Sequence, residues 1–346
     1  EQGKPVIGFG AGEPDFPTPE YVVKDVQVAA EDTSNHKYSP VAGLTILKEE
    51  IVRTSQLYSG INVQQENILV SNGGKHAILT TFMSILNPGD EVLIPSPYWT
   101  TYPEAVKISG GNPIIVDTEF DDDFKVNTEQ LDALKTSKTK ILVWVSPSNP
   151  TGVVYTKEEA EKIYNWAFEN NVWILSDELY EHLVYEGMTS PSPAQYDTEL
   201  NNTIIINGVA KAYSMTGWRV GWIIANTDVI DMAKKIQSHA TSNVSNISQI
   251  AAYSALKNGL NETKIMKESF NRRRLYAIEE FSNIENVNLI KSTGAFYLFP
   301  DVSYYSSDGV IKGVHNSIDF CNWLLDEYFI AFVPGEVFGK NGFLRC

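Results

Sequence analysis

Polar and reactive residues recur in this sequence directly after short apolar segments, where the parallel strands of a sheet would end. In chain order they are Gly74 with Lys75, Trp99, Asn149, Asp177 with Tyr180, Lys211, and Arg219. Ligands of open parallel sheets bind beyond the carboxyl ends of the strands, so we expect these side chains to meet at one edge. An anion-binding loop, an aromatic plate, an amide, a carboxylate with a phenol, an amine and a guanidinium would then face one pocket.

These groups suit the chemistry of a phosphorylated pyridine aldehyde. The Lys211 amine can bond covalently to the aldehyde and later carry a proton, and the Asp177 carboxylate can keep the ring nitrogen protonated. The Asn149 amide and the Tyr180 phenol can lie next to the ring hydroxyl, and the Trp99 indole can stack on the ring face. The simplest alternatives are a surface position for Lys211, a helix cap for Asp177 and a core position for Trp99.

The phosphate of such a ligand needs an anion site, and Gly73-Gly74 at the start of an expected helix offers one. Backbone N–H groups at a helix N-terminus bind anions, and Arg219 can add a bidentate, charge-assisted contact. A second glycine-rich stretch, from Gly8 to Gly12, resembles a dinucleotide fingerprint, but Glu13 occupies the sixth position and several prolines follow. The fingerprint requires a helix there, and the prolines deny it, so we reject a nicotinamide cofactor.

The elements that would position these residues alternate between strands and helices from about residue 66 to 225. Short apolar runs predict strands at 67–70, 91–94, 113–116, 140–145, 172–175 and 203–206. Helices are expected at 75–86 and after Thr156, where Glu159 completes a capping box. Continuous apolar strands that alternate with helices are typical of a mostly parallel sheet covered on both faces. The predicted fold class is therefore α/β.

After Ala225 the sequence becomes more charged and its pattern changes. Helices are expected over 228–237 and 247–283, and the triplet Arg272-Arg273-Arg274 is expected on a solvated helix face. A smaller α+β region follows, with expected strands near 287–290, 295–299 and 330–333 and a helix near 318–327. Together with the chain length, this change indicates about two domains.

The composition limits the possible classes of function. The 346 residues carry a net charge of −16, whereas non-specific nucleic-acid binding needs a basic surface, so no nucleic-acid partner is expected. The two cysteines, Cys321 and Cys346, form neither a metal-ligand spacing nor a disulfide framework. No stretch approaches the roughly 20 apolar residues of a membrane span, and no signal peptide is visible. We therefore expect a cytoplasmic enzyme or binding protein without a metal.

The segment around Lys211 is specific enough to indicate a family. Residues 207–221, Asn-Gly-Val-Ala-Lys-Ala-Tyr-Ser-Met-Thr-Gly-Trp-Arg-Val-Gly, closely resemble the lysine signature of class I aminotransferases, in the bacterial aspartate aminotransferase branch. Further motifs match the same family in the same order, namely Ala11-Gly12-Glu13-Pro14-Asp15-Phe16, Ser148-Asn149-Pro150-Thr151-Gly152, Ser176-Asp177-Glu178-Leu179-Tyr180, Gly294-Ala295-Phe296-Tyr297 and Val333-Pro334-Gly335. The resemblance covers essentially the whole chain.

The resemblance implies the fold type I architecture of enzymes that use pyridoxal 5′-phosphate (PLP). It implies a large PLP-binding domain at 20–250 and a small domain formed by 1–19 and 251–346. Because the family extends further at both ends, we expect the chain to be truncated at both. Lys211 would then hold the cofactor and act as general acid and base, while Asp177 would pair with the pyridine nitrogen.

For the phosphate, the resemblance implies contacts from Arg219, Gly74 and Lys75. Position 210 departs from the pattern, because Ala210 stands where many relatives carry a phosphate-binding serine. Tyr38 resembles the tyrosine that reaches the phosphate in the neighbouring subunit; its alternative is surface packing. A site shared in this way implies a homodimer.

For the substrate, Arg345 matches the arginine that forks onto the α-carboxylate, a bidentate task that lysine would perform poorly. Gly12 would contact the same carboxylate through its backbone, next to Trp99 and Asn149. Lys75 is a candidate for the distal carboxylate of aspartate, although it could equally be a phosphate neighbour or a solvated residue. The leading expectation is a ping-pong transfer from aspartate to 2-oxoglutarate. Alternatives are a transaminase for alanine, aromatic amino acids or prephenate, and a carbon–sulfur lyase.

Overall fold

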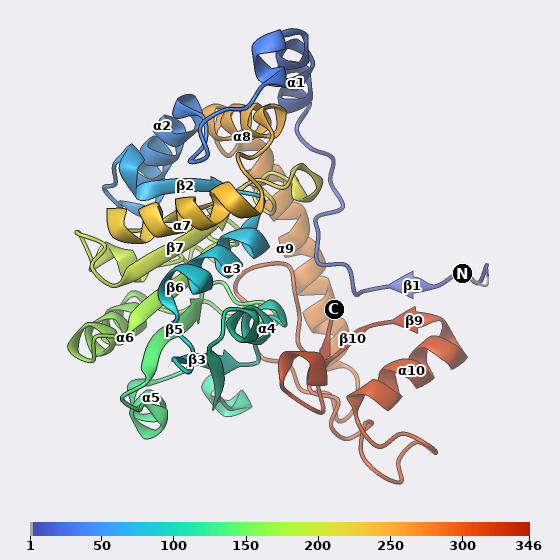
Figure 1. Ribbon diagram of the computed structural model, residues 1–346. Helices are drawn as coiled ribbons and strands as arrows, with labels where there is room; N and C mark the ends of the chain where they lie inside the picture. The colour runs from blue at the N-terminus through green and yellow to red at the C-terminus, as the bar shows by residue number, and fades with distance from the viewer. Residues whose placement is uncertain (1–2) are drawn as a thin grey trace.

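A seven-stranded sheet forms the centre of the computed structural model, which describes residues 3–346 (Figure 1). The strand order is β2-β8-β7-β6-β5-β3-β4, and β8 runs antiparallel to both of its neighbours while the other adjacent pairs run parallel. The strands are β2 (Ile68–Ser71), β3 (Glu91–Ser96), β4 (Asn112–Asp117), β5 (Thr139–Val145), β6 (Trp173–Asp177), β7 (Thr203–Gly208) and β8 (Gly221–Ile224). The mostly parallel sheet is confirmed, and β8 is an additional strand.

Helices cover both faces of this sheet, as the continuous apolar strands require. Successive residues of a strand point to opposite faces, so Leu69 packs with one group of helices and Val70 with another. The first group is α3 (Gly74–Ile85), α4 (Thr101–Ile108) and α7 (Thr227–Ala240). The second group is α2 (Thr45–Thr54), α5 (Thr128–Leu134), α6 (Lys157–Glu169) and α8 (Asn246–Asn258), with α1 (Glu20–Glu31) packed on α8.

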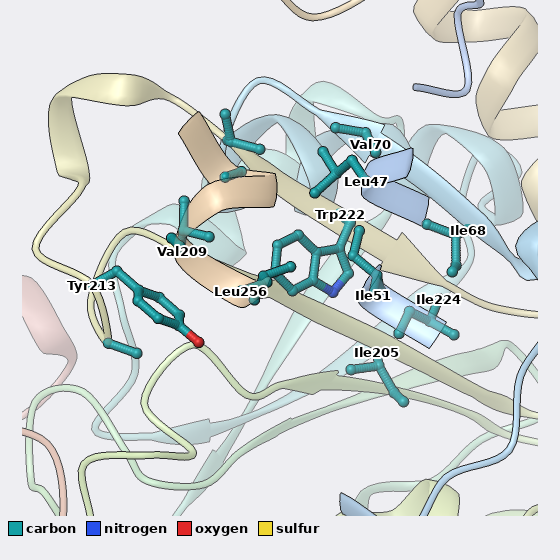
Figure 2. Close-up of a cluster of buried hydrophobic side chains, with 14 of the residues drawn as sticks. Leu47, Ile51, Ile68, Val70, Ile205, Val209, Tyr213, Trp222, Ile224 and Leu256 are labelled. Atoms are coloured by element: carbon teal, nitrogen blue, oxygen red, sulfur yellow. The ribbon is translucent and has the colours of Figure 1, made fainter. Parts of the chain in front are cut away.

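Trp222 of β8 lies at the centre of one of these cores. Figure 2 shows its indole between Leu47 and Ile51 of α2, Leu256 of α8 and Ile205 of the neighbouring strand. All five side chains are at most 5% exposed. This packing fixes the antiparallel strand β8 in the sheet, together with Arg219, which lies just before it.

The remaining part of the chain lies to one side of the sheet (Figure 1). It contains α9 (Asn261–Ser282), α10 (Ser317–Tyr328), β9 (Ile330–Ala331), β10 (Val333–Pro334) and β11 (Leu344–Arg345). The N-terminal strand β1 (Ile7–Gly8) pairs in parallel with β9, and β10 pairs antiparallel with β11. These short ladders bring both ends of the described chain together.

Several expectations for this C-terminal part were wrong. No regular strand forms at 287–290 or 295–299, where the structure has isolated bridges such as that between Asn288 and Asp301. Ala295 has a φ of +55°, which is incompatible with a continuous strand. The expected strand at 330–333 is divided into β9 and β10, which pair with different partners. The expected helix at 247–283 is interrupted at Gly259, whose φ is +79°.

The arginine triplet is also only partly solvated. Arg272 and Arg273 are exposed, as expected, but Arg274 is 6% exposed. Its guanidinium donates to the Ser292 carbonyl oxygen at 2.6 Å and pairs with Glu186 at 2.8 Å. Arg274 therefore fastens α9 to two neighbouring loops.

None of the helices described between residues 3 and 346 combines the length and apolar character that crossing a membrane requires.

Candidate active site

A cavity of about 350 Å³ opens at the sheet edge where the parallel strands end. It is lined by all of the residues predicted from that edge, namely Gly74, Lys75, Trp99, Asn149, Asp177, Tyr180, Lys211 and Arg219. Arg219 reaches this edge because it precedes β8, which runs antiparallel and therefore begins where its neighbours end. Gly12 and Arg345 complete the lining from the two ends of the chain.

One end of the cavity is an anion cradle formed by the start of α3 and Arg219. Gly73 has a φ of +82°, and a Cβ there would lie 2.7 Å from Arg219 Nη2. A Cβ on Gly74 would lie 2.7 Å from Leu179 Cδ1. Gly73 therefore allows the backbone at the start of this 12-residue helix to approach the guanidinium, and Gly74 allows it to pack against Leu179. The helix start, its dipole and the arginine together suit a phosphate.

Asp177 lies at the end of β6 and is 3% exposed. Its Oδ2 accepts a hydrogen bond from the Tyr102 hydroxyl at 2.7 Å, and its Oδ1 accepts one from the Leu179 N–H at 3.3 Å. Burial raises the pKa of Asp177, while the two hydrogen bonds and the nearby Lys211 charge act in the opposite direction. A buried carboxylate of this kind is suited to a cationic ring nitrogen.

Lys211 follows β7 and extends its amine toward the N-terminal segment, where Nζ donates a hydrogen bond to the Gly12 carbonyl oxygen. Burial lowers its pKa to about 8; Glu13 opposes this shift and Arg345 adds to it. A substantial fraction of the amine is therefore neutral near pH 8. The neutral amine is the form that attacks an aldehyde and accepts a proton.

Tyr180 and Tyr297 share a hydrogen bond between their hydroxyl groups, 2.8 Å apart. Burial raises the pKa of Tyr180 well above its ordinary value, so this phenol stays protonated and can donate. A Cβ on Gly12 would lie 3.1 Å from the Tyr297 hydroxyl, so a larger residue here would press on the phenol that bonds Tyr180.

Arg345 of β11 contributes a buried positive charge, with only 8% of the residue exposed. Nη1 donates to Asn149 Oδ1 at 3.1 Å and Nη2 donates to the Gly10 carbonyl oxygen at 2.9 Å, whereas Nε is buried without a partner. Within residues 3–346, no carboxylate lies within 4.0 Å of this guanidinium. A buried cation without a counter-charge favours an anionic ligand. Asn149 keeps its amide N–H groups free to donate.

The remaining predicted residues are less buried. Lys75 is exposed, and its Nζ lies 5.1 Å from the centroid of the half-buried Trp99 ring. Ala210 lines the cavity without a hydroxyl group. Tyr38 follows a short 3₁₀ helix, Thr33–His36, is 91% exposed and does not line this cavity. Its contact with the phosphate of a neighbouring subunit therefore stays a prediction.

Four further polar residues line the cavity, and none of them was predicted from the sequence to belong to the site. They are Glu13, Tyr102, Thr216 and Tyr297. Tyr102 lies three residues after Trp99, but Trp99 precedes the helix that begins at Thr101, so helical spacing does not predict that both face the cavity. Glu13 Oε2 accepts a hydrogen bond from Thr216 Oγ1 at 2.8 Å. Glu13 and Tyr297 belong to motifs already noted, but the motifs alone assign them no contact.

The residues present fit the cofactor that the resemblance implies. The cradle of Gly73, Gly74 and Arg219 suits a phosphate, the buried Asp177 suits a pyridine nitrogen, and the lysine with the lowered pKa suits an aldehyde. The buried Arg345, without a carboxylate partner, is left for the carboxylate of a second molecule.

Comparison with known proteins agrees with this geometry. A family model described as aminotransferase class I and II matches residues 4–346. The chain is 46% identical to an aspartate aminotransferase of Streptomyces avermitilis, over 99% of this chain and 85% of that protein. It is 39% identical to a probable aspartate/prephenate aminotransferase of Aquifex aeolicus, over 99% of this chain and 86% of that protein. The crystal structure of an aspartate aminotransferase from Rhizobium meliloti superposes on this chain with a TM-score of 0.95 at 36% identity. The match covers 99% of this chain and 87% of that one.

Proposed function

Because the chain belongs to the class I and II aminotransferase family, we propose that it transfers the amino group of aspartate to 2-oxoglutarate. The chain is a PLP-dependent aminotransferase of fold type I. The observation that carries the proposed substrate class is the placement of two cationic side chains around one cavity. Arg345 is buried without a carboxylate partner among the described residues, and Lys75 stands exposed beside Trp99.

PLP supplies an aldehyde that bonds the amino group and a ring that withdraws electrons from the substrate α-carbon. Lys211 supplies the amine that holds the cofactor and then moves the proton at the α-carbon. Asp177 stabilises the positive charge on the ring nitrogen, and Arg345 with Asn149 orients the substrate by its α-carboxylate. A fixed guanidinium holds the substrate in one orientation within the cavity that Lys211 also lines, which lowers the entropic part of the barrier.

Replacing Arg345 by lysine should raise the KM for every amino donor alike, by about 10- to 100-fold, because at least one charge-assisted hydrogen bond to the α-carboxylate is lost. Steady-state kinetics with aspartate, glutamate and alanine would measure this change. Arg272→Lys, at an exposed position of α9, is the matched control and should leave all three KM values unchanged. A loss confined to one donor would contradict the role of Arg345.

Replacing Lys75 by alanine should lower kcat/KM for aspartate by about fivefold, the effect expected of one exposed ion pair. Alanine as donor should be unaffected because it has no distal carboxylate. Lys107→Ala, at another exposed lysine outside the cavity, is the control. Equal losses for aspartate and alanine would remove the distal-carboxylate role and leave Lys75 as a neighbour of the phosphate.

A panel of amino donors against 2-oxoglutarate tests the proposed activity itself. Aspartate should be the best donor, followed by glutamate. Aromatic amino acids should be poor donors because their uncharged rings cannot form an ion pair with Lys75. The name of the Aquifex aeolicus relative includes prephenate, so prephenate belongs on the acceptor side of the panel. The panel also includes cysteine and a thioether of cysteine. Release of pyruvate, ammonia and the corresponding thiol or sulfide from these two, without amino transfer from aspartate, would indicate a carbon–sulfur lyase and overturn the proposal.

The assembly and the division of the chain also belong to this proposal. We propose a homodimer in which Tyr38, 91% exposed in the single chain, reaches the phosphate of the partner's site. We also propose two domains, a large one that begins at residue 20 and a small one formed by 1–19 and the C-terminal part, supported by the pairing of β1 with β9. The boundary expected at 250 lies inside α8, whose Leu256 packs with Trp222 of the sheet, so we place the end of the large domain after Asn258. A cytoplasmic location is proposed from the free cysteines Cys321 and Cys346.

A further inference from the structure

Tyr102 connects two residues of the cavity that come from different strands. It lies in the first turn of α4, is 1% exposed, and its hydroxyl donates to Asp177 Oδ2 at 2.7 Å. Its ring meets the Trp99 ring edge to face, with centroids 5.7 Å apart and an angle of 86°. The strand before α4 and the strand that carries Asp177 are separated by β5, so this hydrogen bond spans the end of an intervening strand.

The direction of this hydrogen bond is fixed by chemistry. Burial and the Asp177 charge together raise the pKa of Tyr102 well above its ordinary value, so the phenol keeps its proton. An ionised carboxylate can only accept, and among residues 3–346 its other oxygen receives a single, longer contact, from the Leu179 N–H at 3.3 Å. Tyr102 is therefore the short hydrogen-bond donor to a carboxylate that is 3% exposed.

We propose that Tyr102 is a positioning residue for the cofactor, which acts by holding the Asp177 carboxylate ionised and oriented toward the ring nitrogen. This inference rests on the proposed role of Asp177. A buried carboxylate that loses its donor becomes more costly to ionise, and its orientation is then set by the weaker contact alone. Without the Tyr102 hydroxyl, the interaction of Asp177 with the ring nitrogen would therefore be weakened, because the carboxylate would be both less readily ionised and less well oriented.

The test is a double-mutant cycle in which the Kd for PLP is measured for the single and double variants. Phenylalanine at position 102 keeps the ring and its contact with Trp99, so Tyr102→Phe removes only the hydroxyl. The full chain freed of cofactor is titrated with PLP, and binding is followed by the change in tryptophan fluorescence. Tyr102→Phe should raise the Kd by about tenfold, as expected for one hydrogen bond to a charged group. In an Asp177→Asn background the same substitution should change the Kd by less than about twofold.

A second measurement separates positioning from packing. At saturating PLP, Tyr102→Phe should lower kcat about tenfold and leave the KM for aspartate within about twofold, because the loss concerns the ring and not the substrate carboxylate. Tyr213→Phe is the matched control, since Tyr213 is 3% exposed and its hydroxyl is buried without a partner in the described part of the chain. It should change neither Kd nor kcat.

The outcomes distinguish the inference from the function on which it rests. Equal losses of affinity in the presence and absence of the Asp177 carboxylate would show that Tyr102 acts through the cavity wall, and the inference would fail. An unchanged Kd in Tyr102→Phe would have the same meaning. Failure of the unsubstituted protein to bind PLP or to transfer an amino group would instead defeat the proposed function.

Discussion

Replacing Lys211 by alanine should abolish covalent capture of the cofactor and lower kcat by at least about 10³-fold. The reason is that one amine performs two tasks, since it bonds the aldehyde and moves the proton at the α-carbon, and a positioned acid–base group alone contributes about 10²- to 10⁴-fold. Burial lowers the pKa of Lys211 to about 8, so the amine is reactive in a pH range where exposed lysines remain charged. Borohydride reduction followed by mass analysis of the intact chain measures the loss of capture.

Lys48 provides the matched control for that experiment. It is a partly buried lysine whose pKa is also lowered mainly by burial, and its amine donates to the Gln65 carbonyl oxygen at 3.0 Å. It does not line the cavity, so Lys48→Ala should retain capture and kcat. Reduction that still fixes PLP to the Lys211→Ala chain would show that another amine holds the cofactor, and the assignment of Lys211 would be wrong.

Replacing Asp177 by asparagine should lower kcat by about 10²- to 10³-fold, the effect of breaking a buried ion pair worth about 3–5 kcal/mol. Asparagine keeps the shape of the side chain, but a neutral amide cannot hold a positive charge on the ring nitrogen. The KM for aspartate should change little, because Arg345 and not Asp177 receives the substrate carboxylate. Steady-state kinetics at saturating PLP measure both quantities.

The control for this substitution is Asp197→Asn. Asp197 is 1% exposed and accepts hydrogen bonds from the N–H groups of Asn201 and Asn202 at 2.8 and 3.0 Å. It therefore tests the general cost of removing a buried carboxylate, and it should lower thermal stability while leaving kcat intact. If Asp177→Asn retained the kcat of the unsubstituted enzyme, the ring nitrogen would have to be stabilised by another group.

Much of the site could be predicted because Gly74, Trp99, Asn149, Asp177 and Lys211 each end or follow a strand whose apolar character is visible locally. The strand positions are set by runs such as Thr203–Gly208, in which all residues are buried, and a parallel sheet places the ends of such runs together. The capping box is a further local signal that was confirmed, since Thr156 and Glu159 bond each other's backbone N–H groups at 3.2 and 2.6 Å. Local chemistry determines both features.

The features that were not predicted depend on contacts between distant segments. The Tyr102 hydroxyl hydrogen-bonds to Asp177, which is 75 positions away in the sequence. The hydroxyl groups of Tyr297 and Tyr180 share a hydrogen bond across 117 positions. Neither residue differs from an ordinary core aromatic in the sequence. The irregular stretch that contains Ala295 also reads as a strand by its apolar residues, but Tyr185 of a distant loop hydrogen-bonds to the Ala295 carbonyl oxygen and the φ is positive. Tertiary contacts override the local pattern there.

The hydrogen bond between Arg345 and the Gly10 carbonyl oxygen joins residues 335 positions apart. Contacts of this sequence separation carry a large loop-closure entropy and form slowly. The recognition element for the amino acid therefore depends on the packing of two segments that are far apart in the sequence. Lys211 and Gly74 lie at the edge of the central sheet, whereas the side chain that receives the substrate carboxylate is held in place by this junction. Cofactor binding and amino-acid selectivity therefore depend on different parts of the fold.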